Sequence, residues 1–541
     1  MKTKVVIVGG GTAGWMTAAY LIRALPWLES ITVVESREIK TIGVGEASFS
    51  TLKLFLDFLG LHEHDWMPFC NASYKLGIKF VNWAAKDGYF YHPFQRYEVV
   101  RGFDAAQWWL KLKPEAPFDQ ACFTTTAMCE ANRSPRRLDG TVFDERVKSF
   151  YMTDGAVPNS SMSHHTVQYP YGYHFDAGLL AKFLMKYALD RGVQHVIDDV
   201  CDVVFDDEGY IASLVGKQRG NIEGDLFIDC TGFRGLLINQ ALKEPFISYT
   251  DSLPNDRAVA IQVPRDREDD IRPYTTATAL SAGWAWTIPL FNRNGTGYVY
   301  CSKYITPEQA EQELRKFVGP LCKEASANHI SMRIGRCVNS WVKNCVAIGL
   351  SSGFVEPLES TAIFVIQHGI EELVKHFPMG RRPTEGQLLS YNSIIADCWD
   401  GVREFLTIHY CATDREDTQY WRDTKKLKLP TSLEQRMKMY RAQLPVSRTI
   451  YQSFHGFEAY SWSVILLGLN YVPQASLACL DGLDATDAND MFGRIERLSA
   501  DLVQTFPSQY EYLVRMRTQM AHGTNEPREK TAPGLQGEMV M

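Results

Sequence analysis

The sequence predicts an α/β fold with a parallel sheet, and three observations support this. A short apolar run leads directly into the spacing G-x-G-x-x-G at Gly9, Gly11 and Gly14. A helical pattern from Trp15 to Leu25 follows, and a second strand-like run then ends in the acid Glu35. This order of strand, glycine turn, helix and strand is typical of a Rossmann-like dinucleotide-binding core.

Each glycine of this turn has a physical reason to be glycine. Gly9 allows the tight turn, Gly11 lets a pyrophosphate approach the backbone, and Gly14 lets the helix pack on the sheet. The helix N-terminus offers free N–H groups to phosphate oxygens, and Glu35 is placed to accept from a ribose hydroxyl. The alternative is a glycine-rich turn without a ligand. The residues predicted to contact the dinucleotide in this unit are Gly9, Gly11, Thr12, Ala13, Gly14 and Glu35.

The composition is that of a large globular protein. Its 541 residues are 45% apolar and 22% charged, and the formal net charge is −7. This balance favours neither nucleic acid nor an anionic membrane surface, and no run of about 18 apolar residues predicts a membrane span. The 12 cysteines form no C-x-x-C pair. We therefore expect reduced thiols, a cytoplasmic location and no metal site.

The α/β pattern is interrupted and later resumes. We expect a discontinuous nucleotide-binding core made of residues 1–61 and 170–380, which includes a mixed sheet. Apolar strands end in glycine turns again at 225–235 and at 345–353, where Gly349 lies. After the first unit, Gly45, Glu46 and Ala47 precede a helical stretch. This loop either lies along a cofactor ring or simply caps that helix.

The interrupting segment, residues 62–169, is rich in Trp, Tyr, Phe and His. Its aromatic side chains either line a tunnel and substrate cavity or form ordinary core. Tyr74 to Phe80 alternates like a strand, which places Ile78 and Phe80 on one side and Lys79 on the other. Residues 381–521 read as a mainly helical, substrate-binding part, and 522–541 as a disordered tail.

One dinucleotide site is visible in the sequence. The stretch Gly295-Thr296-Gly297 lacks the third glycine that a second complete unit requires. An enzyme with fixed sites for both FAD and a nicotinamide often shows two such units. A single unit followed by later glycine turns favours FAD alone. The flavin then arrives already reduced, or is reduced by a loosely held nicotinamide.

Further motifs carry a resemblance to a known family. Gly283 to Pro289 contains the motif W-x-W-x-I-P with Trp284 and Trp286, and Lys79 lies in the alternating run. Residues 353–362 form a third motif immediately before a helix. Together with the glycine fingerprint, these motifs make residues 1–475 resemble the FAD-dependent tryptophan halogenase family. The resemblance implies the Rossmann-like FAD-binding core of PHBH-like flavin monooxygenases.

The resemblance also implies a mechanism. FAD, reduced by a separate NAD(P)H-dependent flavin reductase, reacts with dioxygen and chloride or bromide to form hypohalous acid. The acid passes through a tunnel to Lys79, which hydrogen-bonds it or becomes a haloamine and directs halogen to an electron-rich aromatic carbon. Trp284 and Trp286 lie between flavin and substrate. A homodimer is compatible with this interpretation.

The acid and halide positions follow from the same motif. Glu359 rather than Glu356 matches the family's acid, because that acid directly precedes a Ser-Thr pair. A carboxylate there stabilises the cationic ring intermediate and takes its proton; the alternative is an acid that complements a helix dipole. The family binds halide through N–H groups of a Thr-Gly pair, here Thr361 and Ala362. Alanine keeps the N–H and excludes halide only if the position needs φ > 0.

The sequence does not identify the substrate. Members that act on free tryptophan have a Phe-Trp pair in a segment where this chain has Phe457 and Trp462 further apart. These two side chains, with His92 and Phe94 as the other wall, are the predicted substrate contacts. Free tryptophan, a larger indole, a peptide-borne tryptophan and a phenol all remain candidates.

Two other functions compete with the halogenase. An FAD-dependent aromatic monooxygenase (hydroxylase) shares the first fingerprint, but it does not require Lys79 together with W-x-W-x-I-P. It also expects an Asp after a glycine where this chain has Gly349-Leu350. A catalytically idle flavin-binding protein, acting as a partner or sensor, has no need of Lys79 and Glu359 together. The halogenase is therefore favoured.

Overall fold

The structure is a computed structural model, and it describes residues 3–37, 45–85, 87–144, 169–378, 380 and 382–521. The predicted tail 522–541 and residues 145–168 of the predicted insertion lie outside the described residues. So do residues 38–44, which precede the predicted cofactor loop at Gly45.

A six-stranded sheet carries the glycine turn. Its strands, in order across the sheet, are β10 (Gln194–Ile197), β2 (Ser30–Glu35), β1 (Lys4–Val8), β14 (Leu226–Asp229), β23 (Cys345–Ala347) and β22 (Trp341–Val342). All neighbours run parallel except the edge pair β22 and β23. Parallel strands present their carboxyl ends at one edge of the sheet, where ligands of such folds bind. The glycine turn after β1 lies at this edge.

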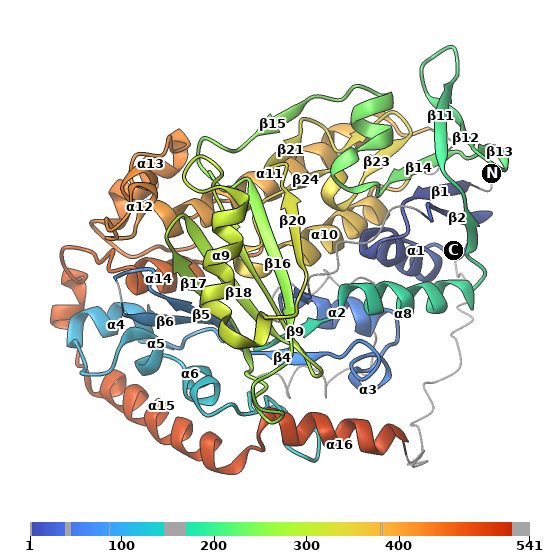
Figure 1. The fold of residues 1–541 in the computed structure, drawn as a ribbon. Helices are drawn as coiled ribbons and strands as arrows, with labels where there is room; N and C mark the ends of the chain where they lie inside the picture. Colours follow the sequence, from blue (N-terminus) through green and yellow to red (C-terminus); the bar gives the residue numbers. More distant parts are fainter. Residues whose placement is uncertain are drawn as a thin grey trace, which may run out of the picture.

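Helix α1 (Thr12–Ala24) follows the turn and is buried on most of its length. It packs against α8 (Ala177–Leu189) and α10 (Ala362–Lys375), as Figure 1 shows at the right of the molecule. Since the N-termini of both α1 and α10 border the cavity described below, two sets of free helix N–H groups face it.

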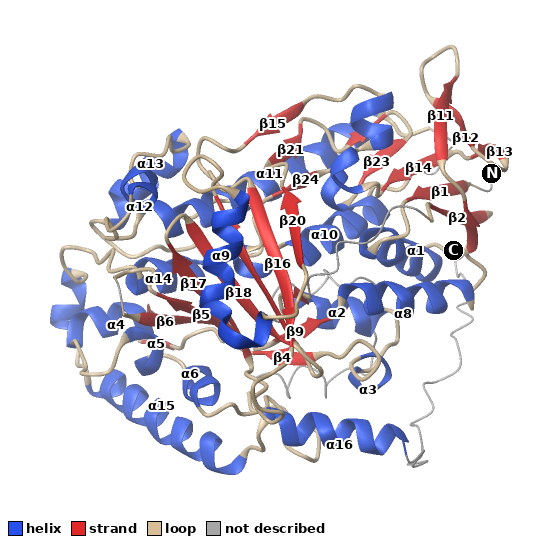
Figure 2. Ribbon diagram, viewed as in Figure 1, coloured by secondary structure: helices blue, strands red, loops and turns tan. Residues whose placement is uncertain are grey.

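A seven-stranded sheet lies at the centre of the view in Figure 2. Its strands, in order, are β20 (Ala327–Ser331), β16 (Arg257–Val263), β19 (Asn294–Tyr300), β18 (Gly283–Pro289), β17 (Tyr274–Leu280), β5 (Gly77–Val81) and β6 (Tyr89–Pro93). The pair β17 and β5 is parallel and the other pairs are antiparallel. Two strands of the 62–169 segment thus extend a sheet from residues 257–331.

The remaining helices surround these sheets. They are α2 (Thr51–Phe58), α3 (Glu63–Trp66), α4 (Ala105–Leu112), α5 (Phe118–Ala121), α6 (Thr124–Glu130), α9 (Pro307–Val318), α11 (Glu385–Cys411), α12 (Gln419–Thr424), α13 (Thr431–Tyr440), α14 (Ala459–Gly468), α15 (Thr486–Thr505) and α16 (Gln509–Ala521). Thr306 and Thr384 begin α9 and α11 with capping boxes, which satisfy helix N–H groups that have no intrahelical partner. Within the described residues, no helix is both long and apolar enough to cross a bilayer.

The smaller sheets join distant parts of the chain. They are β3 (Glu46–Ala47) with β9 (Gly172–Phe175) and β4 (Ser73–Lys75); β11 (Val200–Phe205) with β12 (Ile211–Gly216) and β13 (Gly220–Glu223); β15 (Phe246–Ser248) with β21 (Gly335–Cys337) and β24 (Gly353–Phe354); and β7 (Val99–Val100) with β8 (Phe103–Asp104). One hydrophobic cluster contains Trp15, Tyr74, Trp284 and Trp462. The main parts of the chain therefore share a core, and the predicted α/β class is confirmed.

The two glycines at the start of α1 differ in what surrounds them, which predicts different effects of substitution. A Cβ at Gly14 lies 1.9 Å from the Gly9 carbonyl oxygen, whereas a Cβ at Gly11 meets no atom within 4 Å. We expect Gly14→Ala to lower the free energy of unfolding by ~1–3 kcal/mol through overpacking. Gly11→Ala is the matched control and leaves stability nearly unchanged while weakening dinucleotide binding. Denaturant unfolding and flavin titration measure the two effects; equal stability loss in both variants would contradict this reading.

Candidate active site

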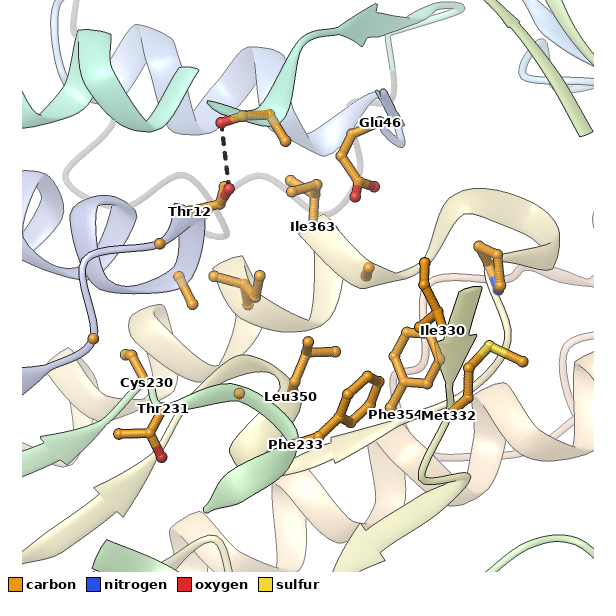
Figure 3. A pocket seen from close by; sticks show the side chains of 18 of the residues that line it. Thr12, Glu46, Cys230, Thr231, Phe233, Ile330, Met332, Leu350, Phe354 and Ile363 are labelled. Atoms are coloured by element: carbon orange, nitrogen blue, oxygen red, sulfur yellow. Dashed lines mark hydrogen bonds between the residues drawn. The ribbon is translucent and has the colours of Figure 1, made fainter. Parts of the chain in front are cut away.

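A cavity of about 430 Å³ runs from the glycine turn after β1 to the segment before α10. Figure 3 shows Thr12 and Glu46 on one side of it, and Phe233, Leu350 and Phe354 on the other. The cavity joins the carboxyl edge of the six-stranded sheet to β18 of the seven-stranded sheet. The cavity therefore connects the predicted cofactor-binding residues to the predicted catalytic acid Glu359.

The cofactor end of the cavity fits a dinucleotide. Gly9 has φ +114°, and Gly11 presents an open backbone to the cavity. The Nε2 of His195 donates to the Glu35 carboxylate at 2.9 Å, which holds this acid at the end of β2. A pyrophosphate requires free N–H groups and a backbone that it can approach, and a ribose requires an acid held in place. This end of the cavity provides all three.

The four other residues predicted to contact the cofactor lie in or near the cavity. Gly45, Glu46 and Ala47 line the cavity, and Gly349 lies beside Ala13, whose Cβ stands 3.0 Å from where a Gly349 Cβ would be. Gly45 and Gly349 have φ of +81° and +78°, a backbone that glycine adopts without strain. Burial raises the pKa of the Glu46 carboxyl to about 7.

Trp284 and Trp286 lie two residues apart on β18, so both rings reach the same face. Their ring centroids are 6.2 Å apart, and both residues line the cavity. A Cβ at Gly297 of the neighbouring β19 comes within 2.1 Å of the Trp286 ring. Gly297 therefore makes room for that ring, which explains one glycine of the Gly295-Thr296-Gly297 stretch.

The segment before α10 has an unusual backbone. Glu359 and Ser360 have φ of +66° and +62°, a left-handed conformation that costs a non-glycine residue free energy and clusters at functional sites. The strain falls on these two residues and not on Ala362, which begins α10 in ordinary helical conformation. An alanine at 362 thus fits the backbone and keeps its N–H at the helix N-terminus.

Two imidazoles hold the Glu359 carboxylate. His92 of β6 places Nδ1 at 2.8 and 3.0 Å from the two carboxylate oxygens, and His409 of α11 places Nε2 at 3.1 Å from one of them. The three side chains are almost fully buried. Burial alone raises the pKa of Glu359, but the two histidines outweigh it and lower that pKa to about 2.

Lys75, the last residue of β4, lies beside this carboxylate. Its side chain is buried, and Nζ donates to the Ser360 hydroxyl at 2.7 Å. The ring of Phe94 lies 4.9 Å from Nζ. Burial lowers the pKa of Lys75 to about 7, against the opposing effect of Glu359. A lysine with this pKa exists as both amine and ammonium near neutral pH.

The structure corrects the expected place of Lys79. Its Nζ pairs with Glu130 at 3.2 Å and lies 3.8 Å from the Tyr89 ring, away from Glu359. The run Tyr74 to Phe80 is not one strand, since β4 ends at Lys75 and β5 begins at Gly77. β4 pairs with β9, whereas β5 pairs with β17 and β6. The break sends the two lysines to different surroundings, and Lys75 is the one beside the acid.

Three of the four predicted substrate residues surround one unpredicted side chain, Phe405 of α11, and the fourth, Phe94, lies beside His92. Phe457 stacks on Phe405 with centroids 3.7 Å apart, and Trp462 meets it edge-on at 5.3 Å. The His92 ring lies 6.1 Å from Phe405 and 6.4 Å from Phe94. This aromatic wall therefore adjoins Glu359 through His92.

Glu356, the other acid of the segment, has different partners. It accepts from Asn255 Nδ2 at 2.6 Å and from the Tyr410 hydroxyl. Burial raises its pKa to about 7 despite these hydrogen bonds. Glu356 thus joins α11 to the start of β16, whereas Glu359 lies with Lys75 and His92.

In the described ranges, no three or more His, Cys, Asp or Glu side chains gather in a way that could hold a metal ion.

Lys75 and His409 are functional candidates that sequence reasoning missed. Lys75 stands between Tyr74 and Leu76, just as Lys79 stands between Ile78 and Phe80, so the sequence offered two equivalent lysines. His409 is 50 residues away from its partner Glu359 in the chain. A pairing over that distance leaves no local signal.

Comparison with known proteins identifies the class. Residues 4–485 match the family model described as tryptophan halogenase. This chain belongs to the tryptophan halogenase family, and it is a flavin-dependent halogenase. The predicted family and function are thereby confirmed.

Close relatives carry more specific names. The chain is 55% identical to the 7-chloro-L-tryptophan 6-halogenase KtzR of Kutzneria sp. (strain 744), over 95% of this chain and 99% of the relative. It is 52% identical to the tryptophan 6-halogenase SttH of Streptomyces toxytricini, over 95% of this chain and 98% of the relative. The crystal structure of that SttH superposes with a TM-score of 0.91 at 50% identity, covering 95% and 99% of the two chains.

Proposed function

We propose that this protein is a tryptophan 6-halogenase in which Lys75 presents the halogen to the indole ring. The observation that carries this proposal is the buried Lys75 beside Ser360 and Glu359, two residues that line the cavity. The two relatives named above, at 55% and 52% identity, are called 6-halogenases, which supports free tryptophan over a peptide or a phenol.

Different residues along the cavity have different roles. Bound FAD in its reduced form, with dioxygen and a halide, supplies hypohalous acid. The N–H groups of Thr361 and Ala362 at the start of α10 would hold the halide, because a helix N-terminus attracts anions. Trp284 and Trp286 line the cavity, and we assign to them the place between the flavin and the substrate.

Lys75 supplies positioning and a proton. Hypohalous acid in free solution attacks many carbons, so one fixed donor is needed for a single ring position. The Lys75 ammonium hydrogen-bonds the acid and protonates the leaving hydroxide as the halogen transfers. The Ser360 hydroxyl accepts a hydrogen bond from Lys75 Nζ at 2.7 Å, which fixes the position of the amine. The negative charge of Glu359 stabilises the cationic ring that forms.

The two lysines give a direct test. We expect Lys75→Met to lower the rate of halogenated product by on the order of 10²-fold or more, while flavin oxidation and release of hypohalous acid continue. Lys79→Met is the matched control, four residues away, and should leave the rate within about twofold, since its partly exposed pair with Glu130 is worth only ~0–1 kcal/mol. Product and free hypohalous acid are measured together by mass spectrometry and a trapping reagent. The opposite ranking of the two variants would return the role to Lys79.

The pKa of Lys75 sets an expected pH dependence. The ammonium is present below about 7 and the amine above it. Product formed per flavin oxidised should therefore fall as the pH rises through about 7, because the proton donor is lost. A ratio that rises through the same range would favour the haloamine. The profile is measured with both chloride and bromide, since a midpoint that moves with the halide belongs to the hypohalous acid itself.

Product analysis tests the substrate. Purified protein with FAD, NADH, an unrelated flavin reductase, air and chloride should convert tryptophan to 6-chlorotryptophan, identified by nuclear magnetic resonance. 7-Chlorotryptophan, a tryptophan-containing peptide and a phenol are offered in parallel. Preference for 7-chlorotryptophan would follow the KtzR relative, and hydroxylated product without halogen would indicate the aromatic monooxygenase instead.

The protein is expected to work with a partner enzyme in the cytoplasm. A separate NAD(P)H-dependent flavin reductase is supported by the single glycine fingerprint at Gly9 to Gly14, which leaves no second fixed nucleotide site in the sequence. A cytoplasmic location is supported by the cysteines, all of which are free thiols.

A further inference from the structure

A chain of hydrogen bonds begins at a backbone carbonyl of β18 and runs to a residue of the cavity. The Ser73 hydroxyl of β4 donates to the Pro289 carbonyl oxygen at 2.6 Å. The same hydroxyl lies 3.2 Å from Nδ1 of His174 on β9. Nε2 of this imidazole lies 2.9 Å from the Thr275 hydroxyl of β17. The three side chains are buried, so the direction of each bond depends on the few protons that the chain itself contains.

The backbone carbonyl fixes every direction in this chain. A carbonyl oxygen only accepts, so the single hydrogen of the Ser73 hydroxyl points at Pro289. Ser73 then accepts from His174, which places the imidazole proton on Nδ1. Burial and the charge of Lys75 hold the pKa of His174 well below its usual range, so the ring is neutral and Nε2 has a lone pair. Thr275 must therefore donate its hydrogen to Nε2.

This direction sets what Thr275 can offer to a ligand. Thr275 lines the cavity together with Ile78, Ala277 and Trp286. Since its hydrogen is used by His174, its oxygen offers only lone pairs to a molecule in the cavity. Such an oxygen attracts an O–H group and repels an anion. It therefore differs from the N-terminus of α10, where free N–H groups favour an anion.

Trp286 supplies a donor on the same face of the sheet. Ala277 of β17 pairs with Trp286 of β18, and Thr275 lies two residues before Ala277, so the three side chains share one face. The indole N–H of Trp286 is buried and has no hydrogen-bond partner among the described residues. A buried donor without an acceptor costs free energy. The cavity wall thus carries one acceptor and one unpartnered donor on adjoining strands.

Thr275 also lies near the strand that carries the reactive amine. The Pro273 carbonyl, two residues before Thr275, accepts from the Leu76 N–H at 2.7 Å, and Leu76 directly follows Lys75. Ser360, which accepts from the Lys75 amine, lines the same cavity as Thr275. A molecule that moves along the cavity toward Lys75 can therefore meet Thr275.

We propose that Thr275 and Trp286 form a binding site for neutral hypohalous acid on its way to Lys75. The proposal rests on the proposed function, which supplies the acid. Hypohalous acid has one O–H donor and an oxygen with lone pairs, so it can donate to Thr275 and accept from Trp286 at the same time. A halide ion has no hydrogen to donate and is repelled by the lone pairs of Thr275. His174 is a positioning residue that keeps Thr275 an acceptor.

Binding of this kind protects the acid and orients it. Both hydrogen bonds are made by the hydroxyl group, so the halogen stays free to reach the amine. Held in this way, the acid is delivered to one position instead of diffusing away. Loss of either hydrogen bond should therefore increase the fraction of acid that escapes before it reaches Lys75.

The experiment follows single turnovers of the full-length protein with reduced FAD, dioxygen, chloride and tryptophan. Flavin oxidation is measured by absorbance, halogenated product by mass spectrometry and free hypohalous acid with a trapping reagent. Thr275→Val keeps the shape of the side chain and removes the hydroxyl. We expect it to lower product per flavin oxidised by about 2- to 10-fold, the effect of one hydrogen bond. The missing halogen should be recovered as free hypohalous acid, with flavin oxidation unchanged.

Two variants separate the hydroxyl from packing. Thr275→Ser keeps the hydroxyl and should restore the wild-type ratio of product to flavin oxidised. Thr276→Val is the matched control, because Thr276 is the next residue of β17 and its side chain lies on the opposite face. It should also give the wild-type ratio.

Every other outcome counts against the site. A wild-type ratio in Thr275→Val overturns the proposal, and so does a loss that Thr275→Ser shares or that Thr276→Val matches. A loss with equally slow flavin oxidation and no released acid would assign Thr275 to the cofactor instead. A wild-type protein that forms no halogenated product from any aromatic compound would contradict the proposed function itself, and this site with it.

Discussion

The active site depends on one buried carboxylate. Glu359 occupies a left-handed backbone that costs free energy and carries a charge out of water. Both costs are offset because His92 and His409 donate to its two oxygens from separate elements, β6 and α11. Removing either donor leaves a buried charge with too few partners. The segment before α10, the strand β6 and the long helix α11 are therefore held in one arrangement by this acid.

That arrangement places the other groups. With Glu359 and Ser360 in the left-handed region, the Ser360 hydroxyl meets Lys75 on β4 and α10 starts two residues later. The helix N-terminus then faces the cavity that begins at the glycine turn after β1. A short strained segment thus links the amine, the acid and the predicted halide position. Trp286, whose ring packs against Gly297, lines the same cavity.

Burial tunes the titratable groups of this region in opposite directions. It lowers the pKa of Lys75 to about 7 and raises that of Glu356 to about 7, while paired imidazoles hold Glu359 near 2. Two carboxyl groups three residues apart therefore differ widely in acidity, because one accepts from imidazoles and the other from a phenol and an amide. Pairs of acids whose surroundings separate their pKa values are typical of catalytic sites.

The sequence by itself determined the α/β class and the family, and it predicted the cofactor turn, because these depend on local patterns: glycine spacing, the acid Glu35 at a strand end and the W-x-W-x-I-P motif. It also singled out Glu359 from its neighbours in the chain. Only the tertiary structure separates the surroundings of Lys75 and Lys79, since the strand break at Leu76 and the strands that pair beyond it place Lys75 beside Ser360 and Lys79 beside Glu130. Likewise His409 and Phe405 met their partners only through packing of α11, a contact between residues far apart in sequence that leaves no local pattern to read.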